Sequence, residues 1–523
     1  MPELQSFTED GPWTLDLDAI AWSVGLPAIR AAAQAKVPRW IRHRILPPGR
    51  RVGRTGVVLG VATGGWALTE RRTGGPVSRA GLSRRLRKAF VRLGPTYIKL
   101  GQIISAAEGL LPEELVAEFK VLRDRVPAEP FDHVRRVIEA DLGRPLDQVF
   151  SSFDAIPVAA ASIAQVHFAT LRTGEPVAVK VQRPGIERLV ERDLTIMAWM
   201  APILAEHVDA LKIINLPALI EVFAETIVEE LDFRLEAGNM LDIARVLDET
   251  GHATIVVPRP HPSLVTKRVL VMERLEGFSF DDVAGMHEAG VDTNAVVRAL
   301  MVSLLEGALI YGVFHGDLHG GNLLVLPDGR VGLLDHGITG RLDERRRGIF
   351  LKMMLSSLGG DHMAVLRCYQ ELGALPADAD LDRFLEEIPV DRPIVDPATA
   401  DADQMLLEMR RVTKALVAHG LKLPKEIVLF MKDFVFLDAS IATLAPDLNL
   451  LAELTFISGY FATTYGETIS RQLGMNPAAV SFDSEALLNS VGMDPKASGL
   501  THREIQQQRT DIRNKMAGRS GGT

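Results

Sequence analysis

FHGDLHGGNLLVLPDGRVGLLDHGITG, residues 314–340, is the stretch from which the fold of this chain can be worked out. Two short apolar runs flank a Pro-Asp-Gly-Arg turn at 327–330 and predict a β-hairpin. Asp317 and Asn322 precede the hairpin, and Asp335 follows it. We expect these two carboxylates and one amide to gather at one end of the hairpin. Such oxygen ligands suit Mg²⁺ and the phosphates that it carries.

The spacing of these residues is that of protein kinases. The kinase catalytic loop has an Asp followed five positions later by an Asn, and an Asp-x-Gly metal loop comes next. Asp317 and Asn322 have the first spacing here, and residues 335–337 have the form of the second. Taken alone, the stretch could equally be an ordinary hairpin with polar turns, because short motifs also match by chance. The other parts of a kinase must therefore occur upstream, in order.

The composition is that of a globular protein with room for two or three domains. The chain has 523 residues, of which 47% are hydrophobic and 24% charged. Its net charge of −9 argues against general nucleic-acid binding, so we expect no nucleic-acid partner. A single cysteine, Cys368, excludes an internal disulfide and indicates a reducing, cytoplasmic compartment.

One region, residues 30–88, is strongly basic and contains a single acid, Glu70. Within it lies an apolar run, 55–68, in which glycines recur every four residues, a pattern of close helix contacts in membranes. The run is short against the ~20 residues that a bilayer span needs. Three interpretations stay open: a solvated basic arm with a small helical hairpin, peripheral association with a membrane surface, and a true span. No signal sequence precedes this region.

Residues 150–181 have the pattern of a β-sheet, and the last strand, Val177 to Val181, contains Lys180. In kinases the lysine of a Val-Ala-Ile-Lys strand pairs with nucleotide phosphates. Upstream, an alanine-rich loop replaces the glycine-rich phosphate loop. The loop consists of Ala159, Ala160, Ala161, Ser162, Ile163 and Ala164. Alanine lacks the freedom of glycine at positive φ, so we expect the loop to cover a nucleotide but to grip its phosphates differently.

A helix is expected over 94–105, with Lys99 and Gln102 on one face. These two polar residues could simply form the solvated side of the helix. A second possibility comes from an acidic segment further along the chain, which contains Glu230 and Asp232. Pairing between the two sites would satisfy both sets of charges.

The same acidic segment contains Glu236, the obvious partner of Lys180. A strand ending at Glu273 then runs into a linker. We expect this linker to be the hinge between two lobes, with a backbone that hydrogen-bonds adenine.

Together these motifs resemble the UbiB/AarF family of atypical kinase-like proteins, which includes the mitochondrial coenzyme Q kinase-like proteins. Each motif is weak, but the ordered set is specific and covers roughly residues 86 to 454. The resemblance implies an α+β, two-lobed protein-kinase-like fold with a helical N-terminal extension. It divides the chain into a basic, membrane-proximal region (1–84), a helical extension (85–149), an N-lobe (150–275), a C-lobe (276–460) and a partly disordered tail (461–523).

The resemblance also implies ATP and Mg²⁺ as cofactors and gives the site residues roles. Lys180 would hold the α- and β-phosphates and be oriented by Glu236. Asn322 and Asp335 would hold metal. Asp317 would position or deprotonate the attacking hydroxyl or water.

In the family, the Lys-x-Gly-Gln helix folds over the active site and blocks the peptide groove. This places Lys99 over Glu230 and Asp232 as a lid. The family is linked to isoprenoid quinones and related lipids, with ATPase activity more evident than protein phosphorylation. The implied partners are a nucleotide, a lipid or isoprenoid quinone, a membrane surface and other biosynthetic proteins.

Three features depart from the family pattern. Both prolines of the usual His-x-Asp-Pro-His-Pro-Gly-Asn motif are replaced, by Leu318 and Gly320. His336 stands where the metal loop of the family has Phe. The sequence therefore does not show which side chain would anchor this loop by hydrophobic contact. The chain past Ile457 is polar and fragmentary, whereas many relatives end in membrane helices. After Gly340, no Ala-Pro-Glu follows to seat a peptide substrate.

The leading hypothesis is an atypical ATP-dependent kinase or ATPase that acts on isoprenoid quinones or related lipids at a membrane surface. The alternative is a non-catalytic, nucleotide-gated lipid-binding or scaffold protein. A genuine protein kinase ranks third.

Overall fold

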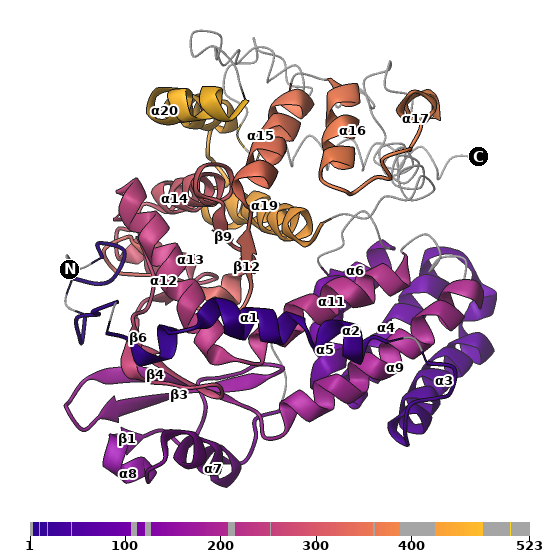
Figure 1. Cartoon of the computed structure of the whole chain (residues 1–523), viewed down its shortest axis with the longest axis horizontal. Helices are drawn as coiled ribbons and strands as arrows, with labels where there is room; N and C mark the ends of the chain where they lie inside the picture. Colours follow the sequence, from indigo (N-terminus) through magenta and orange to yellow (C-terminus); the bar gives the residue numbers. More distant parts are fainter. Residues whose placement is uncertain are drawn as a thin grey trace. The chain divides into compact units, whose positions relative to one another are not determined.

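The computed structural model describes residues 4–9, 11–17, 19–42, 44–105, 112–120, 127–207, 215–251, 253–358, 361–387, 424–473, 501 and 503. The chain forms two compact units. Unit 1 comprises Met1–Arg245, Val257–Glu276 and Leu334–Ile338, and unit 2 comprises Val246–Val256, Gly277–Leu333 and Thr339–Thr523. The chain thus leaves unit 1 just after the expected hinge strand and returns to it briefly for the Asp-x-Gly loop. Figure 1 labels helices and strands of both units.

Unit 1 is built on an antiparallel sheet with the strand order β1-β3-β4-β7-β6, and with β2 paired to β3. The expected strand around Lys180 is the central strand β4. The strands are β1 (Phe150–Phe153), β2 (Ala159–Ala160), β3 (Ala164–Leu171), β4 (Pro176–Gln182), β6 (Pro260–Val265) and β7 (Val269–Glu273).

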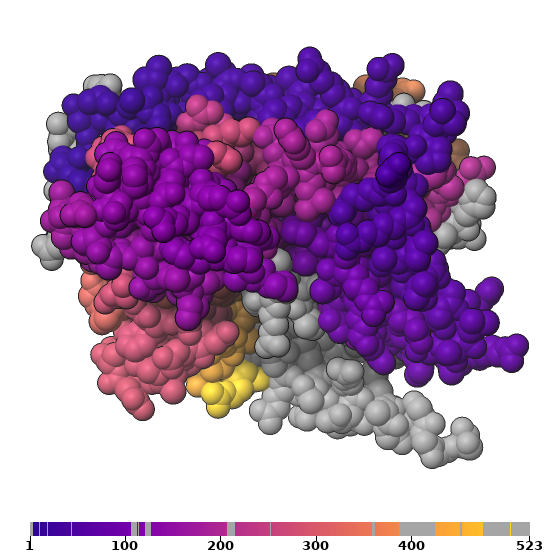
Figure 2. Space-filling model, turned by 90° about the horizontal axis from the view of Figure 1, so that it is seen from below, coloured from indigo at the N-terminus to yellow at the C-terminus, as the bar shows by residue number. Residues whose placement is uncertain are grey.

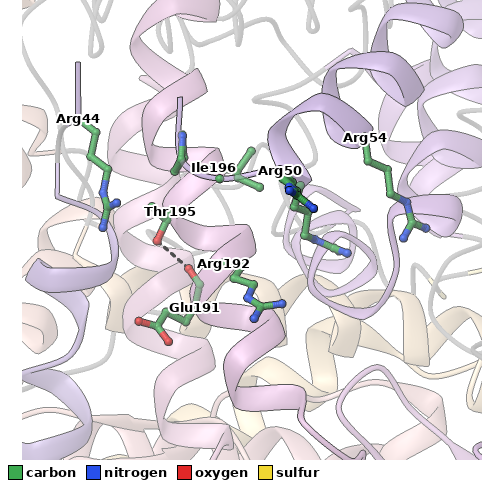
Figure 3. A pocket seen from close by; sticks show the side chains of 10 residues that line it. Arg44, Arg50, Arg54, Glu191, Arg192, Thr195 and Ile196 are labelled. Carbon is green, nitrogen blue, oxygen red and sulfur yellow. Dashed lines mark hydrogen bonds between the residues drawn. The ribbon is translucent and has the colours of Figure 1, made fainter. Parts of the chain in front are cut away.

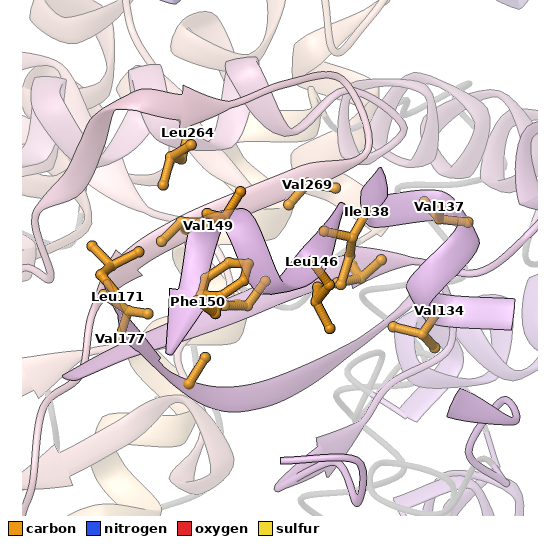
Figure 4. Close-up of a cluster of buried hydrophobic side chains, with 14 residues drawn as sticks. Val134, Val137, Ile138, Leu146, Val149, Phe150, Leu171, Val177, Leu264 and Val269 are labelled. Atoms are coloured by element: carbon orange, nitrogen blue, oxygen red, sulfur yellow. The ribbon is translucent and has the colours of Figure 1, made fainter. Parts of the chain in front are cut away.

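One face of this sheet carries the core of the unit. Val177, Val179 and Val181 alternate along β4 and are fully buried. They pack with residues of α7 (Phe131–Leu142) and α8 (Leu146–Val149), as Figure 4 shows. Side chains alternate between the faces of a strand, so this packing places Lys180 on the opposite face.

The other helices of unit 1 lie before and between these strands. In the basic region α3 and α4 contact each other and form a helical hairpin, which was part of one of the three interpretations left open. The helices are α1 (Leu26–Gln34), α2 (Val37–Trp40), α3 (Arg51–Thr69), α4 (Gly75–Leu93), α5 (Pro95–Ser105), α6 (Glu113–Lys120), α9 (Ile186–His207), α11 (Leu216–Glu230) and α12 (Phe233–Thr250), the last of which continues into unit 2; short 3₁₀ turns lie at Ala21–Ser23 and Arg71–Thr73.

The first residues of the chain cover the edge strand β6. The indole N–H groups of Trp13 and Trp22 donate to the carbonyls of Pro260 (3.2 Å) and His261 (3.1 Å). Arg259, which is 1% exposed, donates to the carbonyls of Trp13 and Thr8. In Figure 2 the N-terminal residues, coloured indigo, lie along this unit. The segment therefore satisfies edge carbonyls that would otherwise face solvent.

Unit 2 contains two small sheets. The hairpin predicted from the sequence forms in the expected register, with Leu323 opposite Leu333 and Val325 opposite Val331. Gly277 lets the chain pass next to it, since a Cβ there would lie 2.5 Å from the Val325 carbonyl oxygen. The strands are β5 (Ile255–Val256), β8 (Phe278–Ser279), β10 (Leu323–Val325) and β11 (Val331–Leu333) in the first sheet, and β9 (Val313–His315) and β12 (Thr339–Arg341) in the second.

Most of the other residues that the structure describes in unit 2 are helical. They are α13 (Val283–Glu288), α14 (Thr293–Glu306), a π-helical turn (Gly307–Tyr311), a 3₁₀ turn (Gly320–Asn322), α15 (Glu344–Leu358), α16 (His362–Glu371), α17 (Leu381–Glu387), α19 (Lys425–Leu444) and α20 (Leu450–Leu473).

The end of α20 corrects one expectation from the sequence. The chain past Ile457 is not fragmentary at first, because α20 continues to Leu473. The hydroxyl groups of Tyr460 and Tyr465 on this helix donate to Glu306 at 2.6 and 2.8 Å, which ties α20 to the end of α14. The remainder of the expected disordered tail lies almost entirely outside the described residues.

Among the described residues, one stretch, Thr293–Tyr311, is long and apolar enough to cross a membrane. It is 61% buried in the protein and includes Glu306, so it has the character of a core helix. The apolar run 55–68, by contrast, belongs to α3, which does not qualify as a candidate membrane span by length and composition.

Candidate active site

The ammonium group of Lys180 lies between two carboxylates that the sequence predicted for the site, Glu236 and Asp335. Its Nζ lies 2.6 Å from Oε1 of Glu236 and 3.0 Å from Oδ2 of Asp335. All three residues belong to unit 1. The side chains of Lys180 and Glu236 are 8% and 3% exposed, whereas that of Asp335 is 36% exposed. One carboxylate therefore anchors the lysine inside the protein, and the other remains open to solvent.

Burial and charge act against each other in this group. Burial lowers the pKa of Lys180, but Asp335 and Glu236 outweigh it, so the pKa lies above its ordinary value and the lysine stays charged. Burial raises the pKa of Glu236 to about 7; Lys180 counteracts this effect, and Asp335 adds to it. The lysine is thus a permanent cation, and the buried glutamate is a group that can change its protonation near neutral pH.

The Asp-x-Gly loop is held by hydrogen bonds and by a buried histidine. The Gly337 N–H donates to Oδ1 of Asp335 at 2.9 Å, and Nδ2 of Asn239 donates to the His336 carbonyl at 2.9 Å. The side chain of His336 is fully buried, as the usual Phe would be. A Cβ at position 337 would lie 3.1 Å from Asp335 Oδ1 and 3.5 Å from Glu230, so glycine gives this loop its close fit.

The charged pair proposed for the lid is present. Lys99 Nζ on α5 lies 2.8 Å from Glu230 Oε1 at the end of α11, with side-chain exposures of 11% and 6%. Gln102 lies farther along α5 and is half-buried. Asp232 differs from the expectation, because its carboxylate binds Arg234 through two guanidinium nitrogens, at 2.9 and 2.7 Å. The Asp232 carboxylate therefore binds the guanidinium group of Arg234, two positions along the chain, and not a residue of α5.

The alanine-rich loop is fastened by a residue that the sequence analysis missed. Arg183 donates from Nε to the Ala161 carbonyl (3.0 Å), from Nη1 to Glu129 (3.1 Å) and from Nη2 to the Pro127 carbonyl (2.8 Å). Ser162, Ile163 and Ala164 are buried, whereas Ala159 and Ala161 are exposed. In the sequence, Arg183 directly follows the strand that contains Lys180. Its neighbours in the sequence, however, did not indicate which groups it would bind.

Glu273 ends β7, as expected, but its N–H is already used. It donates to the Arg259 carbonyl at 2.8 Å, and the Glu273 carboxylate accepts from Thr8 and from the Arg259 N–H. The adenine contact expected at the hinge therefore cannot come from this N–H, because sheet pairing consumes it. The carbonyl of Glu273 or the residues after it are the remaining candidates.

Asp317 and Asn322 belong to unit 2 and are connected there. Nδ2 of Asn322 donates to the Asp317 carbonyl at 3.0 Å, and the Asp317 N–H donates to Nδ1 of His315 at 3.1 Å. These bonds set the shape of the 315–322 loop without the two prolines of the family motif. Asp335, the other expected metal ligand, belongs to unit 1. Its surroundings are therefore described separately from those of Asn322.

Two neighbours on α19 were missed by the sequence analysis. Lys432 forms an ion pair with the Asp317 carboxylate. Asp433 is fully buried, and its Oδ1 accepts from the Leu318 N–H at 2.9 Å. Burial raises the pKa of Asp433 well above its ordinary range, although Lys432 and the Leu318 N–H oppose this shift. Adjacent charges inside an otherwise apolar helical run were the available signal, since burying them requires partners.

The side chains described in each unit have the chemistry that a nucleotide carried by Mg²⁺ requires. In unit 1, Asp335 offers a carboxylate of the kind that Mg²⁺ takes, and Lys180 offers a cation for phosphates; in unit 2, Asn322 offers an amide oxygen. No group of three or more His, Cys, Asp or Glu side chains suited to a metal occurs in the part of the chain that the structure describes.

Comparison with known proteins defines the class, which is that of atypical kinase-like proteins. Residues 121–369 match the family model for the ABC1 atypical kinase-like domain. The chain is 35% identical over 87% of its length to an uncharacterised protein of Mycobacterium tuberculosis, 93% of which is covered. It is 33% identical to an aarF domain-containing protein kinase of the Arabidopsis thaliana chloroplast, covering 70% of this chain and 73% of that protein.

A similar match, 31% identity covering 70% of this chain and 67% of the other, is found to a probable protein kinase UbiB of Marinobacter nauticus. Among solved structures, the complex of a Mycobacterium tuberculosis protein with erythromycin aligns with a TM-score of 0.36 and 24% identity, over 66% of this chain and 91% of that one. The chain belongs to the ABC1, or UbiB/AarF, family of atypical kinase-like proteins. The family and the fold class predicted from the motifs are confirmed.

Proposed function

We propose that this protein is an ATP-dependent atypical kinase or ATPase that acts on an isoprenoid quinone or related lipid at a membrane surface. The observation that carries the proposal is Lys180, whose Nζ lies between Glu236 (2.6 Å) and Asp335 (3.0 Å). A buried lysine between an anchoring carboxylate and a partly exposed one has the surroundings that phosphoryl-transfer sites require. Family membership supports the class of reaction.

Each residue of the site has a distinct task in this proposal. Glu236 holds Lys180 in one rotamer, so the ammonium points to where phosphate oxygens bind. Asp335 and Asn322 would hold Mg²⁺, which would supply positive charge to neutralise the phosphates. Asp317 orients the hydroxyl or water that attacks, and Lys432 keeps the Asp317 carboxylate in a fixed direction.

The ion pair between Asp317 and Lys432 also favours the second candidate, a nucleotide-gated lipid-binding protein without turnover. A carboxylate already held by a cation is a less available acceptor for a substrate proton. Lys99 and Glu230 would serve either function, because Glu230, which binds Lys99, also lies next to Gly337 of the Asp-x-Gly loop.

The test measures Mg²⁺-dependent ATP binding and phosphate release, with membranes and candidate lipids present. Asp335→Asn should weaken ATP binding in Mg²⁺ by about tenfold or more, since an uncharged amide is a poor ligand. Asp317→Asn should bind ATP normally but lose about 100-fold or more in turnover. Asp328→Asn, in the turn of the β10–β11 hairpin, is the matched control.

Equal ATP affinities of the wild-type protein and Asp335→Asn in Mg²⁺ would contradict the metal assignment. Tight ATP binding by the wild-type protein without phosphate release under any lipid condition would favour the nucleotide-gated alternative instead.

A further inference from the structure

A cavity of about 740 Å³ lies in unit 1 between the start of α3 and the first half of α9 (Figure 3). Its wall is rich in arginine, with Glu191 as the one carboxylate among its described lining residues. In Figure 3, Arg44 and Arg54 stand on opposite sides, with Arg50 and Arg192 between them. This local positive charge is opposite in sign to the net charge of the chain, −9.

Most arginines of the neighbouring helical hairpin are already bound to acids. Arg79, Arg85 and Arg87 pair with Glu114, Glu70 and Glu118, at 2.8 to 3.1 Å. Arg51, at the edge of the cavity, is likewise bound to Asp193 and to the Leu93 carbonyl. Several arginines of this region are therefore used structurally, in ion pairs with nearby acids.

The guanidinium groups in the cavity are different. Those of Arg44, Arg50 and Arg192 form no hydrogen bond or ion pair with any residue that the structure describes. Arg54 donates to the Arg92 carbonyl at 2.8 Å and forms no salt bridge within the described ranges. Four arginines thus converge on one cavity with donors to spare. Planar guanidinium groups match the oxygens of phosphate, often through two hydrogen bonds at once.

Large apolar side chains stand in solvent directly beside this cavity. Ile45 and Leu46, which follow Arg44 in the chain, are 90% and 77% exposed. On α3 the exposed residues Val57, Val61 and Leu68 continue the helix face that starts at Arg50 and Arg54. At about 100° per residue, these five positions fall within about 60° of one another around the helix axis.

We propose that the cavity binds the phosphate of an anionic phospholipid headgroup, while Ile45, Leu46 and the exposed face of α3 contact the lipid around it. The inference deepens the proposed function, because it gives the membrane surface a specific contact point on this chain. Basic residues bordering an apolar helix face are the combination that binds anionic leaflets. A soluble phosphate compound would use the arginines but would leave Ile45 and Leu46 without a role.

The experiment measures partition of the full-length protein onto vesicles of phosphatidylcholine with or without phosphatidylglycerol. Arg44→Gln/Arg192→Gln should weaken partition onto the anionic vesicles by about tenfold or more. The matched control, Arg136→Gln/Arg144→Gln, removes the same charge from the region of α7 and should partition as the wild-type protein does. Ile45→Ser/Leu46→Ser should also weaken partition, and its thermal unfolding should be unchanged because both side chains are already in solvent.

Equal partition of the two arginine double variants would overturn the proposal. Inorganic phosphate is the second probe. If phosphate binds tightly without vesicles while Ile45→Ser/Leu46→Ser still partitions like the wild-type protein, the site takes a free anion and the lipid assignment is wrong. Mg²⁺-dependent ATP binding separates this outcome from the proposed function. The arginine variant should bind ATP as the wild-type protein does, and Asp335→Asn should bind ATP more weakly while still binding vesicles.

Discussion

Lys180 experiences two opposing effects at the scale of a single residue. Its position on β4 buries it, which disfavours a charge, and its two carboxylate partners restore the charge. The balance is uneven between the partners, because Glu236 is far more buried than Asp335. The consequence is a glutamate whose pKa is raised to about 7.

This raised pKa predicts a particular pH dependence of stability. The folded protein holds the Glu236 proton more tightly than the unfolded chain, whose glutamate has the ordinary value of 4.5. The stabilisation from this group is therefore complete below pH 4.5 and is lost as the pH rises towards 7. The free energy of unfolding of the nucleotide-free protein, relative to Glu236→Gln, should fall by on the order of 3 kcal/mol across that window.

The measurement is denaturant unfolding of both proteins at a series of pH values. Glu276→Gln, at an exposed position, serves as the control and should follow the wild-type curve. A wild-type minus Glu236→Gln difference that is flat, or that rises with pH, would contradict the assignment.

At the scale of elements, α5 is held in place by a charge pair at the end of α11. The Lys99–Glu230 pair is almost completely buried, so removing one partner leaves the other charge without compensation. Glu230 also lies next to Gly337, so one side chain contacts both α5 and the Asp-x-Gly loop.

A double-mutant cycle with Lys99→Ala and Glu230→Ala measures this coupling. We expect a coupling free energy of about 1–3 kcal/mol in thermal or denaturant unfolding, because each single change leaves a buried charge. The exposed pair Lys352–Glu371, at 3.3 Å, is the control cycle and should give about 1 kcal/mol or less. Strict additivity at positions 99 and 230 would mean that the two side chains do not interact in solution, and α5 would not be held in this way.

The alanine-rich loop is the second element whose position depends on one side chain. Arg183 bonds Ala161, Glu129 and Pro127 with three different nitrogens, which a lysine cannot reproduce. Arg183→Lys should therefore loosen the loop, seen as faster amide exchange across 159–164 and as weaker ATP binding, by about tenfold or less. Arg172→Lys, at the exposed end of the same sheet, is the control. Unchanged exchange and affinity in Arg183→Lys would show that the loop is held by its strand pairing alone.

At the scale of the whole molecule, the first residues of the chain are part of unit 1. Trp13, Trp22 and Arg259 join the N-terminal segment to the edge strand β6, and Arg30 on α1 donates to Asn239, the residue that anchors the Asp-x-Gly loop. These hydrogen bonds connect the basic region, through Arg30 on α1 and Asn239 on α12, to the Asp-x-Gly loop of the candidate active site.

Trp22→Ala should destabilise unit 1 by about 3–5 kcal/mol, because it removes a large buried side chain and exposes a strand edge. Differential scanning calorimetry measures the loss, and light scattering at the transition should show more association. Val24→Ala, at an exposed position in the same segment, should change neither. A wild-type transition temperature in Trp22→Ala would mean that the segment does not stabilise the sheet.

The sequence alone predicted features that depend on residues a few positions apart better than contacts between residues far apart in the chain. The strand with Lys180, the 323–333 hairpin and the helix at 95–105 were predictable because side-chain periodicity and turn residues act over a few positions. The Lys180–Glu236 and Lys99–Glu230 pairs could be suggested by charge balance within an ordered set of motifs. Neither pair could be derived from spacing, because each joins residues far apart in the chain.

The amino-acid sequence by itself determined the class of this protein: the order of its motifs, its family and its kinase-like fold. The tertiary structure decided the contacts that depend on how helices and loops meet. It paired Asp317 with Lys432, Asp232 with Arg234 and Ala161 with Arg183, and it gathered unpaired arginines around one cavity. The physical reason is that such contacts are chosen by burial and competition among several available charges, and only packing selects one partner from many.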